Sequence, residues 1–132
     1  PSLFSCREWP WNLYNEDHEW GKRYHLSGED YERAKEIYKA YISALAFLPG
    51  NLSIFYGDEA GLEGYGDPFN RMPYPWGKEE RRLISAYSEI NSIRRENSVY
   101  KKGAFKLHHL TNELLVFSRT SGEYSYFTIF NY

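Results

Sequence analysis

The sequence predicts a fold of the α/β plus β class, in which an α/β segment is followed by an antiparallel β segment. Three observations support this prediction. Apolar residues recur with a helical period between residues 27 and 48, a run of β-forming residues follows at 52–56, and the period changes to two after residue 103. The predicted domain boundary therefore separates residues 1–102 from residues 103–132.

Length and charge limit the classes of function. The 132 residues correspond to one ordinary domain. A formal net charge of -2 provides no positive field for phosphate backbones or anionic lipid, so we expect no nucleic-acid partner. No run of about 18 apolar residues is present, so we expect no membrane partner. Cys6 is the only cysteine, which excludes an intrachain disulfide and leaves the compartment open.

The first 26 residues have no clear period and are typical of a long ordered loop. Asp17, His18 and Glu19, with His25 further on, carry side chains that coordinate metal ions. Their spacing fits no metal-binding motif, so a solvated polar loop is the favoured interpretation. We expect no metal and no cofactor.

The first predicted helix begins at Ser27, whose hydroxyl suits the N-cap, and has acidic residues in its first turn. Pro49-Gly50 ends it. The β-forming run at 52–56 follows, so the pair is typical of an αβ unit from a parallel sheet. Such a strand needs parallel neighbours, and no other run in the chain resembles one.

The segment 57–77 contains five glycines and three prolines, which predicts a defined irregular loop. Loops at the carboxyl ends of parallel strands are where α/β folds place their ligand sites. A second helix is predicted from about residue 78 to 96, followed by strands that begin near 103, at 114–117 and at 124–130. Residues 120–123 are the predicted turn between the last two strands.

Residues 47–76 carry a specific resemblance. They contain Phe-Leu-Pro-Gly at 47–50, Ile-Phe-Tyr-Gly-Asp-Glu-Ala-Gly-Leu-Glu-Gly at 54–64, Asp-Pro-Phe-Asn-Arg-Met-Pro at 67–73, and Trp76. This order resembles the α-amylase family of glycoside hydrolases, and most closely its cyclomaltodextrinase, neopullulanase and maltogenic amylase group. The resemblance implies that residues 1–102 are the last αβα portion of a (β/α)8 barrel. It also implies that residues 103–132 begin an antiparallel C-terminal β-sandwich domain.

The resemblance further implies retaining cleavage of α-glucosidic bonds by two carboxyl groups, a nucleophile and a general acid/base. In the family these groups follow earlier barrel strands, and a further Asp lies in an Asn-His-Asp motif that this sequence lacks. We therefore expect no catalytic residue in this chain and predict that it is inactive alone. The substrate would be an α-glucan oligosaccharide or polysaccharide with α-1,4 bonds, α-1,6 bonds being the alternative. The nearest partner would be the remainder of its own barrel.

By position in the family motif, the substrate-binding residues are Asp67 and Arg71. A carboxylate accepts sugar hydroxyls, and a guanidinium offers a rigid fork of donors. The alternative is that Asp67 and Arg71 only pair with each other and brace the loop. Asp58 and Glu59 are adjacent, which suits bracing better than a shared catalytic role. Three further aromatic residues are either sugar platforms or packing groups: Tyr65, Tyr74 and Trp76.

A second hypothesis is a self-contained carbohydrate-binding or scaffold module without enzymatic activity. The aromatic content of 19% would suit it, since aromatic rings serve both as packing groups and as flat platforms for sugar rings. The single parallel-type strand argues against it, because its backbone partners are missing. The sequence leaves open which glucan is cut, whether hydrolysis or transglycosylation dominates, and whether the protein forms a homo-oligomer.

Overall fold

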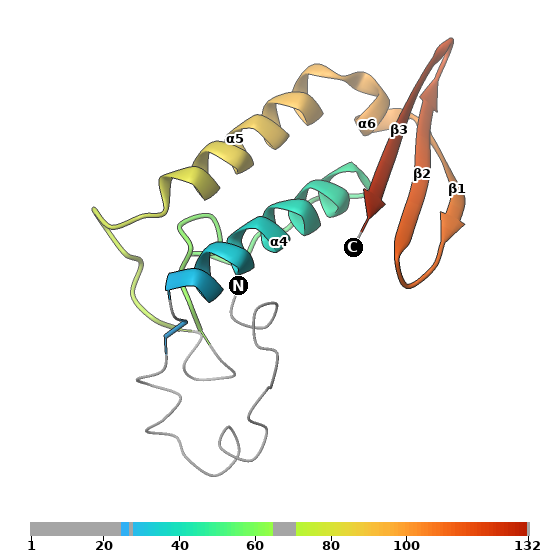
Figure 1. The fold of residues 1–132 in the computed structure, drawn as a ribbon. Coiled ribbons are helices and arrows are strands. Elements are labelled where there is room, and N and C mark those ends of the chain that lie inside the picture. Colours follow the sequence, from blue (N-terminus) through green and yellow to red (C-terminus); the bar gives the residue numbers. More distant parts are fainter. Residues whose placement is uncertain (1–24, 27, 65–70, 132) are drawn as a thin grey trace. The chain divides into compact units, whose positions relative to one another are not determined.

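The computed structural model describes residues 25–26, 28–64 and 71–131. It contains the helices α4 (Gly28–Phe47), α5 (Arg81–Glu96) and α6 (Ser98–Lys102) and the strands β1 (Ala104–Leu110), β2 (Leu114–Ser121) and β3 (Tyr124–Asn131), shown in Figure 1. No helix in this part of the chain is long and apolar enough to cross a membrane. The described residues form two compact units. The first contains residues up to Lys39 and Ile54–Ile84, and the second Ala40–Ser53 and the residues from Ser85 onward.

The two long helices confirm the predicted helical segments. Helix α4 has Glu29 and Asp30 in its first turn, where negative charge is favourable, and it ends two residues before Pro49. Helix α5 starts three residues later than predicted. Glu80 precedes it, and its carboxylate accepts the backbone N–H of Arg82 at 3.1 Å. Glu80 therefore occupies the N-cap position and fixes where α5 begins.

The predicted strand at 52–56 is wrong for the described structure, because this segment has no regular secondary structure. Ile54 and Phe55 are 38% and 52% exposed. A strand is stable only when a neighbour pairs with its backbone, and no described residue supplies a parallel neighbour here. The β-forming residues of this segment were therefore not sufficient to predict a strand.

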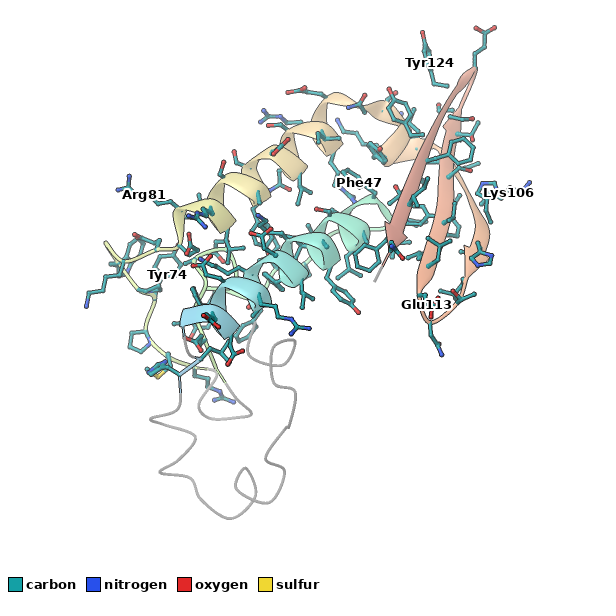
Figure 2. The ribbon with its side chains drawn as sticks, in the orientation of Figure 1. Phe47, Tyr74, Arg81, Lys106, Glu113 and Tyr124 are labelled. Atoms are coloured by element: carbon teal, nitrogen blue, oxygen red, sulfur yellow. The ribbon has the colours of Figure 1, made fainter. Side chains whose placement is uncertain are left out.

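The antiparallel β segment is confirmed, with a three-stranded sheet in the order β1-β2-β3. Strand β2 extends four residues further than predicted, and the turn shrinks to Gly122-Glu123. Such a two-residue hairpin requires positive φ, which Gly122 supplies at +59°. Tyr124 and Glu113 mark opposite ends of the sheet (Figure 2). The register of β1 shifts between Leu107 and His109, which makes a β-bulge.

One face of the sheet forms the core of the second unit. Phe117 is fully buried, and the ring of Phe130 meets Tyr41 edge-on at 5.2 Å. Arg119 is only 3% exposed, and its Nε and Nη2 both donate to the carbonyl oxygen of Gly103. The short helix α6, which the sequence did not predict, places Tyr100 against Tyr126. Burying Arg119 is tolerated because each of its three side-chain nitrogens donates a hydrogen bond to a carbonyl oxygen.

Candidate functional site

The candidate site is built on the loop between residues 57 and 77, whose described residues belong to the first compact unit. The loop begins with a tight turn in which the backbone N–H of Leu62 donates to the carbonyl oxygen of Gly57 at 2.9 Å. Gly57 has a φ of +88°, and a Cβ there would lie 2.7 Å from Leu62 Cδ2. Only glycine fits this conformation and this close approach. The sequence therefore fixes the path of the loop at its first residue.

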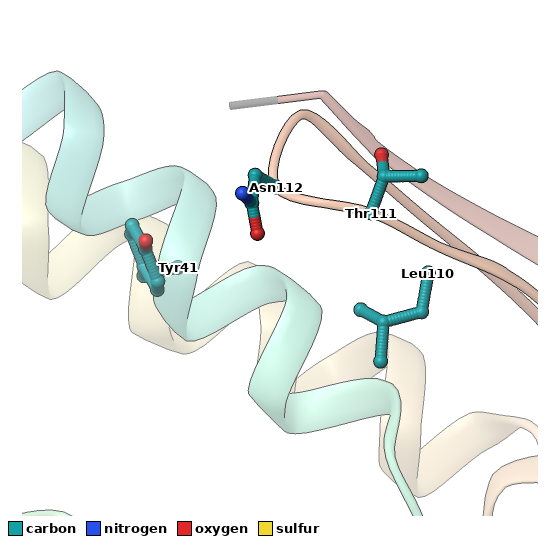
Figure 3. Close-up of a pocket in the computed structure, with 4 residues that line it drawn as sticks. All are labelled: Tyr41, Leu110, Thr111 and Asn112. Carbon is teal, nitrogen blue, oxygen red and sulfur yellow. The ribbon is translucent and has the colours of Figure 1, made fainter.

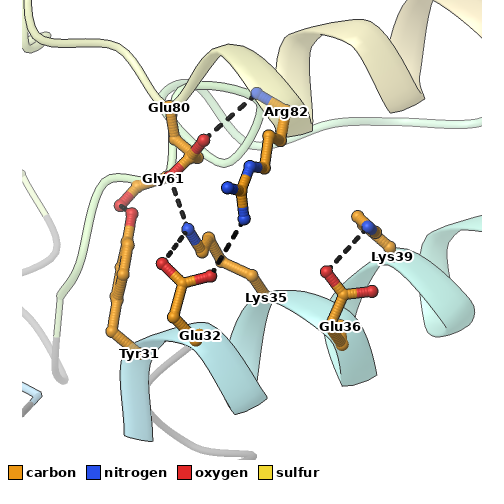
Figure 4. Close-up of polar contacts among 8 residues, drawn as sticks. All are labelled: Tyr31, Glu32, Lys35, Glu36, Lys39, Gly61, Glu80 and Arg82. Atoms are coloured by element: carbon orange, nitrogen blue, oxygen red, sulfur yellow. Dashed lines mark hydrogen bonds and ion pairs between the residues drawn. The ribbon is translucent and has the colours of Figure 1, made fainter. Parts of the chain in front are cut away.

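Helix α4 holds both ends of the loop (Figure 4). Near the start of the loop, the hydroxyl of Tyr31 donates to the carbonyl oxygen of Gly61 at 3.0 Å. Just after its end, Lys35 Nζ lies 2.6 Å from Glu80 Oε2 and 2.7 Å from Glu32 Oε1. The two ends also meet directly, because the backbone N–H of Glu80 donates to the carbonyl oxygen of Ala60 at 2.9 Å.

Lys35 is the most buried charged side chain of this anchor, with only 3% of it exposed. Burial lowers its pKa, but the hydrogen bonds to Glu32 and Glu80 outweigh that effect and leave the pKa above its usual value. The same hydrogen bond from Lys35 is the main reason that the pKa of Glu80 lies below its usual value. Both groups are therefore charged near neutral pH, and their pairing stabilises the anchor.

Asp58 and Glu59 are occupied by contacts within the first unit. Burial raises the pKa of the Asp58 carboxyl, and a hydrogen bond from Tyr38 partly offsets this effect. Glu59 Oε2 accepts the backbone N–H of Gly57 at 3.0 Å. Their environments fit the bracing role that the sequence favoured.

The predicted substrate-binding pair is only partly visible. Asp67 lies outside the described residues, as does Tyr65, so the structure does not test whether Asp67 and Arg71 lie together. Arg71 is exposed. The residue after it is fixed, because the hydroxyl of Tyr56 donates to the carbonyl oxygen of Met72 at 2.7 Å. The backbone beside Arg71 is thus tied to the segment that enters the loop.

The two remaining aromatic candidates form a pair. The ring centroids of Tyr74 and Trp76 are 4.6 Å apart, and their planes are tilted by 50°. Trp76 keeps 81% of its surface exposed, whereas Tyr74 is half-buried. The sequence left platform and packing roles open for both, and the structure places them side by side.

Metal binding finds no support in the described residues, among which no group of three or more His, Cys, Asp or Glu side chains could hold an ion. His25 lies 3.5 Å from Glu63 and forms a two-residue contact. Asp17, His18 and Glu19 lie outside the described residues.

A pocket in the second unit is lined by Tyr41, Leu110, Thr111 and Asn112 (Figure 3). Its lining contains no carboxylate, imidazole or amine, so it offers no group for acid–base chemistry near neutral pH. It is therefore not the candidate catalytic site.

The sequence interpretation missed the anchor of Tyr31, Lys35 and Glu80. One signal was present: Lys35 lies four residues after Tyr31, so both share one side of the helix that carries the apolar stripe. A lysine there needs a partner when it is buried. The partner is 45 residues away in the sequence, and spacing alone could not identify it.

Comparison with known proteins gives the family context. No family model matches the chain. It is 36% identical over 92 residues to an amylopullulanase of Thermoanaerobacter thermohydrosulfuricus. The aligned segment covers 67% of this chain and 6% of that protein. It is also 35% identical over 68 residues to a cyclomaltodextrinase of Thermoanaerobacter pseudethanolicus. Here the aligned segment covers 50% of this chain and 12% of that protein. The chain thus spans a small part of the curated relatives that it matches.

Solved structures agree with the sequence relatives. The ligand-free cyclic α-maltosyl-(1→6)-maltose hydrolase of Arthrobacter globiformis is similar with a TM-score of 0.63 and 25% identity, over 69% of this chain and 21% of that one. The maltogenic amylase of S. marinus is similar with a TM-score of 0.62 and 32% identity, over 70% of this chain and 14% of that one. Over about 70% of its length, this chain is therefore homologous to enzymes of the α-amylase family, as its motifs predict.

Proposed function

We propose that this chain is part of a retaining α-glucan glycoside hydrolase that acts on α-1,4-glucosidic bonds, with α-1,6 bonds as a second class. In this proposal the chain supplies substrate-binding residues, and the catalytic carboxylates lie elsewhere in the complete enzyme. The observation that carries it is the similarity of 67% of the chain to an amylopullulanase. The likeness to a cyclic α-maltosyl-(1→6)-maltose hydrolase supports the same substrate class.

The proposed placement assigns residues 1–102 to the last αβα portion of a (β/α)8 barrel and residues 103–132 to the start of a C-terminal β-sandwich. Two features support it. The segment 52–56 has β-forming residues but no partner among the described residues, as expected for a strand whose neighbours belong to a larger sheet. Strands β1 to β3 form an antiparallel sheet, as expected for the second domain.

Substrate binding is assigned to Asp67 and Arg71. A carboxylate accepts hydrogen bonds from two sugar hydroxyls, and the planar guanidinium donates to hydroxyl oxygens in a fixed geometry. The exposure of Arg71 supports this role, because a binding residue must be accessible to its ligand. The hydrogen bond between Tyr56 and Met72 supports it further, because it limits the motion of the backbone next to Arg71.

The proposal gives Asp58 and Glu59 no catalytic role, and their surroundings support this. Retaining cleavage needs two carboxyl groups about 5–5.5 Å apart, one on each side of the bond that breaks. The carboxylate of Asp58 accepts a hydrogen bond from Tyr38, and that of Glu59 accepts one from Gly57. These contacts hold the turn together and would have to break before either carboxylate could reach a substrate.

The proposal is tested with the complete natural polypeptide that contains these residues and with the 132-residue chain alone. We expect the complete polypeptide to cleave starch, pullulan or cyclodextrin and to release products in the α-configuration, detected by proton NMR before mutarotation. Asp58→Asn and Glu59→Gln should retain turnover, and the 132-residue chain should have none. A complete polypeptide that binds these glucans without cleaving them would instead support a carbohydrate-binding module. Products of β-configuration would contradict retention.

A further inference from the structure

We propose that Trp76, supported by Tyr74, is a stacking platform for a glucose unit of an α-glucan chain. This inference deepens the proposed function, because it names a specific contact for the same substrate class.

The first observation is the exposure of Trp76. Trp76 keeps 81% of its residue surface in contact with solvent, more than any other large apolar residue described as exposed. Tryptophan is highly buried on average, because its large apolar surface gains much from leaving water. Tyr74 covers part of the ring, so at least one indole face remains open.

The second observation is that the turn around Trp76 is held in place. The backbone N–H of Trp76 donates to the carbonyl oxygen of Tyr74, and that of Lys78 donates to Pro75, both at 2.9 Å. Pro73 and Pro75 flank Tyr74 and restrict its backbone. A backbone that is already ordered loses little conformational entropy when a ligand binds, which favours recognition.

The third observation links the platform to the start of the loop. The negative charges of Glu59 and Glu79 lie near the Tyr74 hydroxyl, and the backbone N–H of Gly57 donates to Glu59 Oε2 at 3.0 Å. The pKa of Tyr74 is raised, first by desolvation and then by the negative charges of Glu59 and Glu79. Both carboxylates accept backbone N–H groups of the loop, Glu59 from Gly57 and Glu79 from Gly77, so the ring pair lies beside a fixed part of the loop.

The chemistry of the pair fits a sugar ring. One face of a pyranose presents C–H groups, which are apolar and carry slightly positive hydrogens, and these match the negative face of an aromatic ring. The planes of Tyr74 and Trp76 are tilted by 50°, so the two rings do not make one flat surface. A flat β-1,4-linked chain would need coplanar platforms, whereas an α-1,4-linked chain curves and suits tilted ones.

The test measures binding of a thio-linked maltopentaose, which resists cleavage, to the complete natural polypeptide by isothermal titration calorimetry. Trp76→Ala should raise Kd about three- to tenfold, the size expected for losing one aromatic contact. Trp76→Phe keeps a flat ring and should recover most of the affinity. Trp76→Leu keeps apolar volume without a ring and should resemble Trp76→Ala. Tyr124→Ala removes another exposed aromatic side chain, in β3 of the second unit, and should leave Kd unchanged.

The remaining outcomes separate this inference from the proposed function. If Trp76→Ala binds the thio-linked maltopentaose as tightly as the unchanged protein, the platform role of Trp76 is overturned. Starch cleavage by the same samples would still support the proposed hydrolase function. Equal affinity of Trp76→Phe and Trp76→Leu for this ligand also overturns the platform role. That result would show that the site needs apolar volume and not the flat face of a ring. Cellopentaose that binds as well as the thio-linked maltopentaose contradicts the preference for a curved chain. Binding without starch cleavage leaves the platform intact and contradicts the hydrolase.

Discussion

Lys35 Nζ lies 2.6 Å from Glu80 Oε2 and joins helix α4 to the N-cap residue of helix α5. Glu32 is the second partner of Lys35 and also contacts Arg82 at 3.2 Å. Because Lys35 is almost completely buried, its charge depends on these carboxylates for compensation. The ion pair therefore holds the region where the candidate loop ends.

The first prediction concerns removal of this charge. Lys35→Met keeps the aliphatic stem but leaves the Glu80 carboxylate, which is 20% exposed, without its cation. We expect the free energy of unfolding to fall by about 2 kcal/mol, the size of a hydrogen bond to a charged group. Urea denaturation of the 132-residue chain measures this change.

Lys39→Met is the matched control. Lys39 pairs with Glu36 at the same i,i+3 spacing, but both side chains are much more exposed than Lys35. Exposed pairs contribute little because water screens them, so a loss of about 0.5 kcal/mol or less is expected. Equal losses for the two variants would contradict the anchoring role of Lys35.

The second prediction is a pH dependence. The pKa of Glu80 is lower in the folded chain than in the unfolded chain, so the unfolded chain binds more protons in the acid range. The stabilisation is therefore present above about pH 4.3, the ordinary value for Glu, and is lost as the pH falls through the folded pKa. The difference in Tm between the unchanged chain and Glu80→Gln should shrink from pH 6 to pH 3. A difference that stays constant over this range would show that the ionised carboxylate contributes nothing.

The third prediction concerns Gly61, which has a φ of +75° and lies next to the Tyr31 hydroxyl. A Cβ at this position would overlap the Tyr31 hydroxyl oxygen and approach Glu80 Cβ to 2.9 Å. We expect Gly61→Ala to lower the free energy of unfolding by about 3 kcal/mol, from backbone strain together with the steric overlap. Thermal and urea denaturation would both report it.

Gly77→Ala separates the two contributions. Gly77 has nearly the same φ, +77°, but a Cβ there would meet nothing within 4 Å. Its loss should be about 1 kcal/mol, from backbone strain alone. If both alanine variants lose the same free energy, the contact between Tyr31 and Gly61 does not restrict the loop.

The sequence predicted the elements that depend on local signals. Helix α4 ends within one residue of its predicted end because Pro49 and Gly50 cannot continue it. The three strands followed from an alternating pattern and a glycine turn. The strand at 52–56 was wrong because strand formation depends on a partner, which β-forming residues do not provide themselves. The start of α5 was misplaced because its cap is a glutamate, which is not a preferred N-cap residue.

Only those residues of the candidate site that belong to a recognisable sequence motif could be predicted. Arg71, Tyr74 and Trp76 were identified from the loop sequence, but the tilt of the ring pair depends on the folded path of the loop. Lys35 was missed because its burial depends on Glu80, which a single helix pattern does not include. The pairing of Asp67 with a sugar or with Arg71 remains a prediction.

The central claim is that the 57–77 loop binds the glucan and leaves the chemistry to other residues, and Arg71→Ala in the complete natural polypeptide tests it most directly. A lost charge-assisted hydrogen bond is worth about 1.5–3 kcal/mol, or roughly ten- to a hundredfold in kcat/KM. We expect that loss for long maltooligosaccharides, a much smaller one for a short aryl glycoside, and little change in Tm. An Arg71→Ala variant that loses several kcal/mol of stability and slows all substrates equally would contradict the account and identify Arg71 as a structural brace.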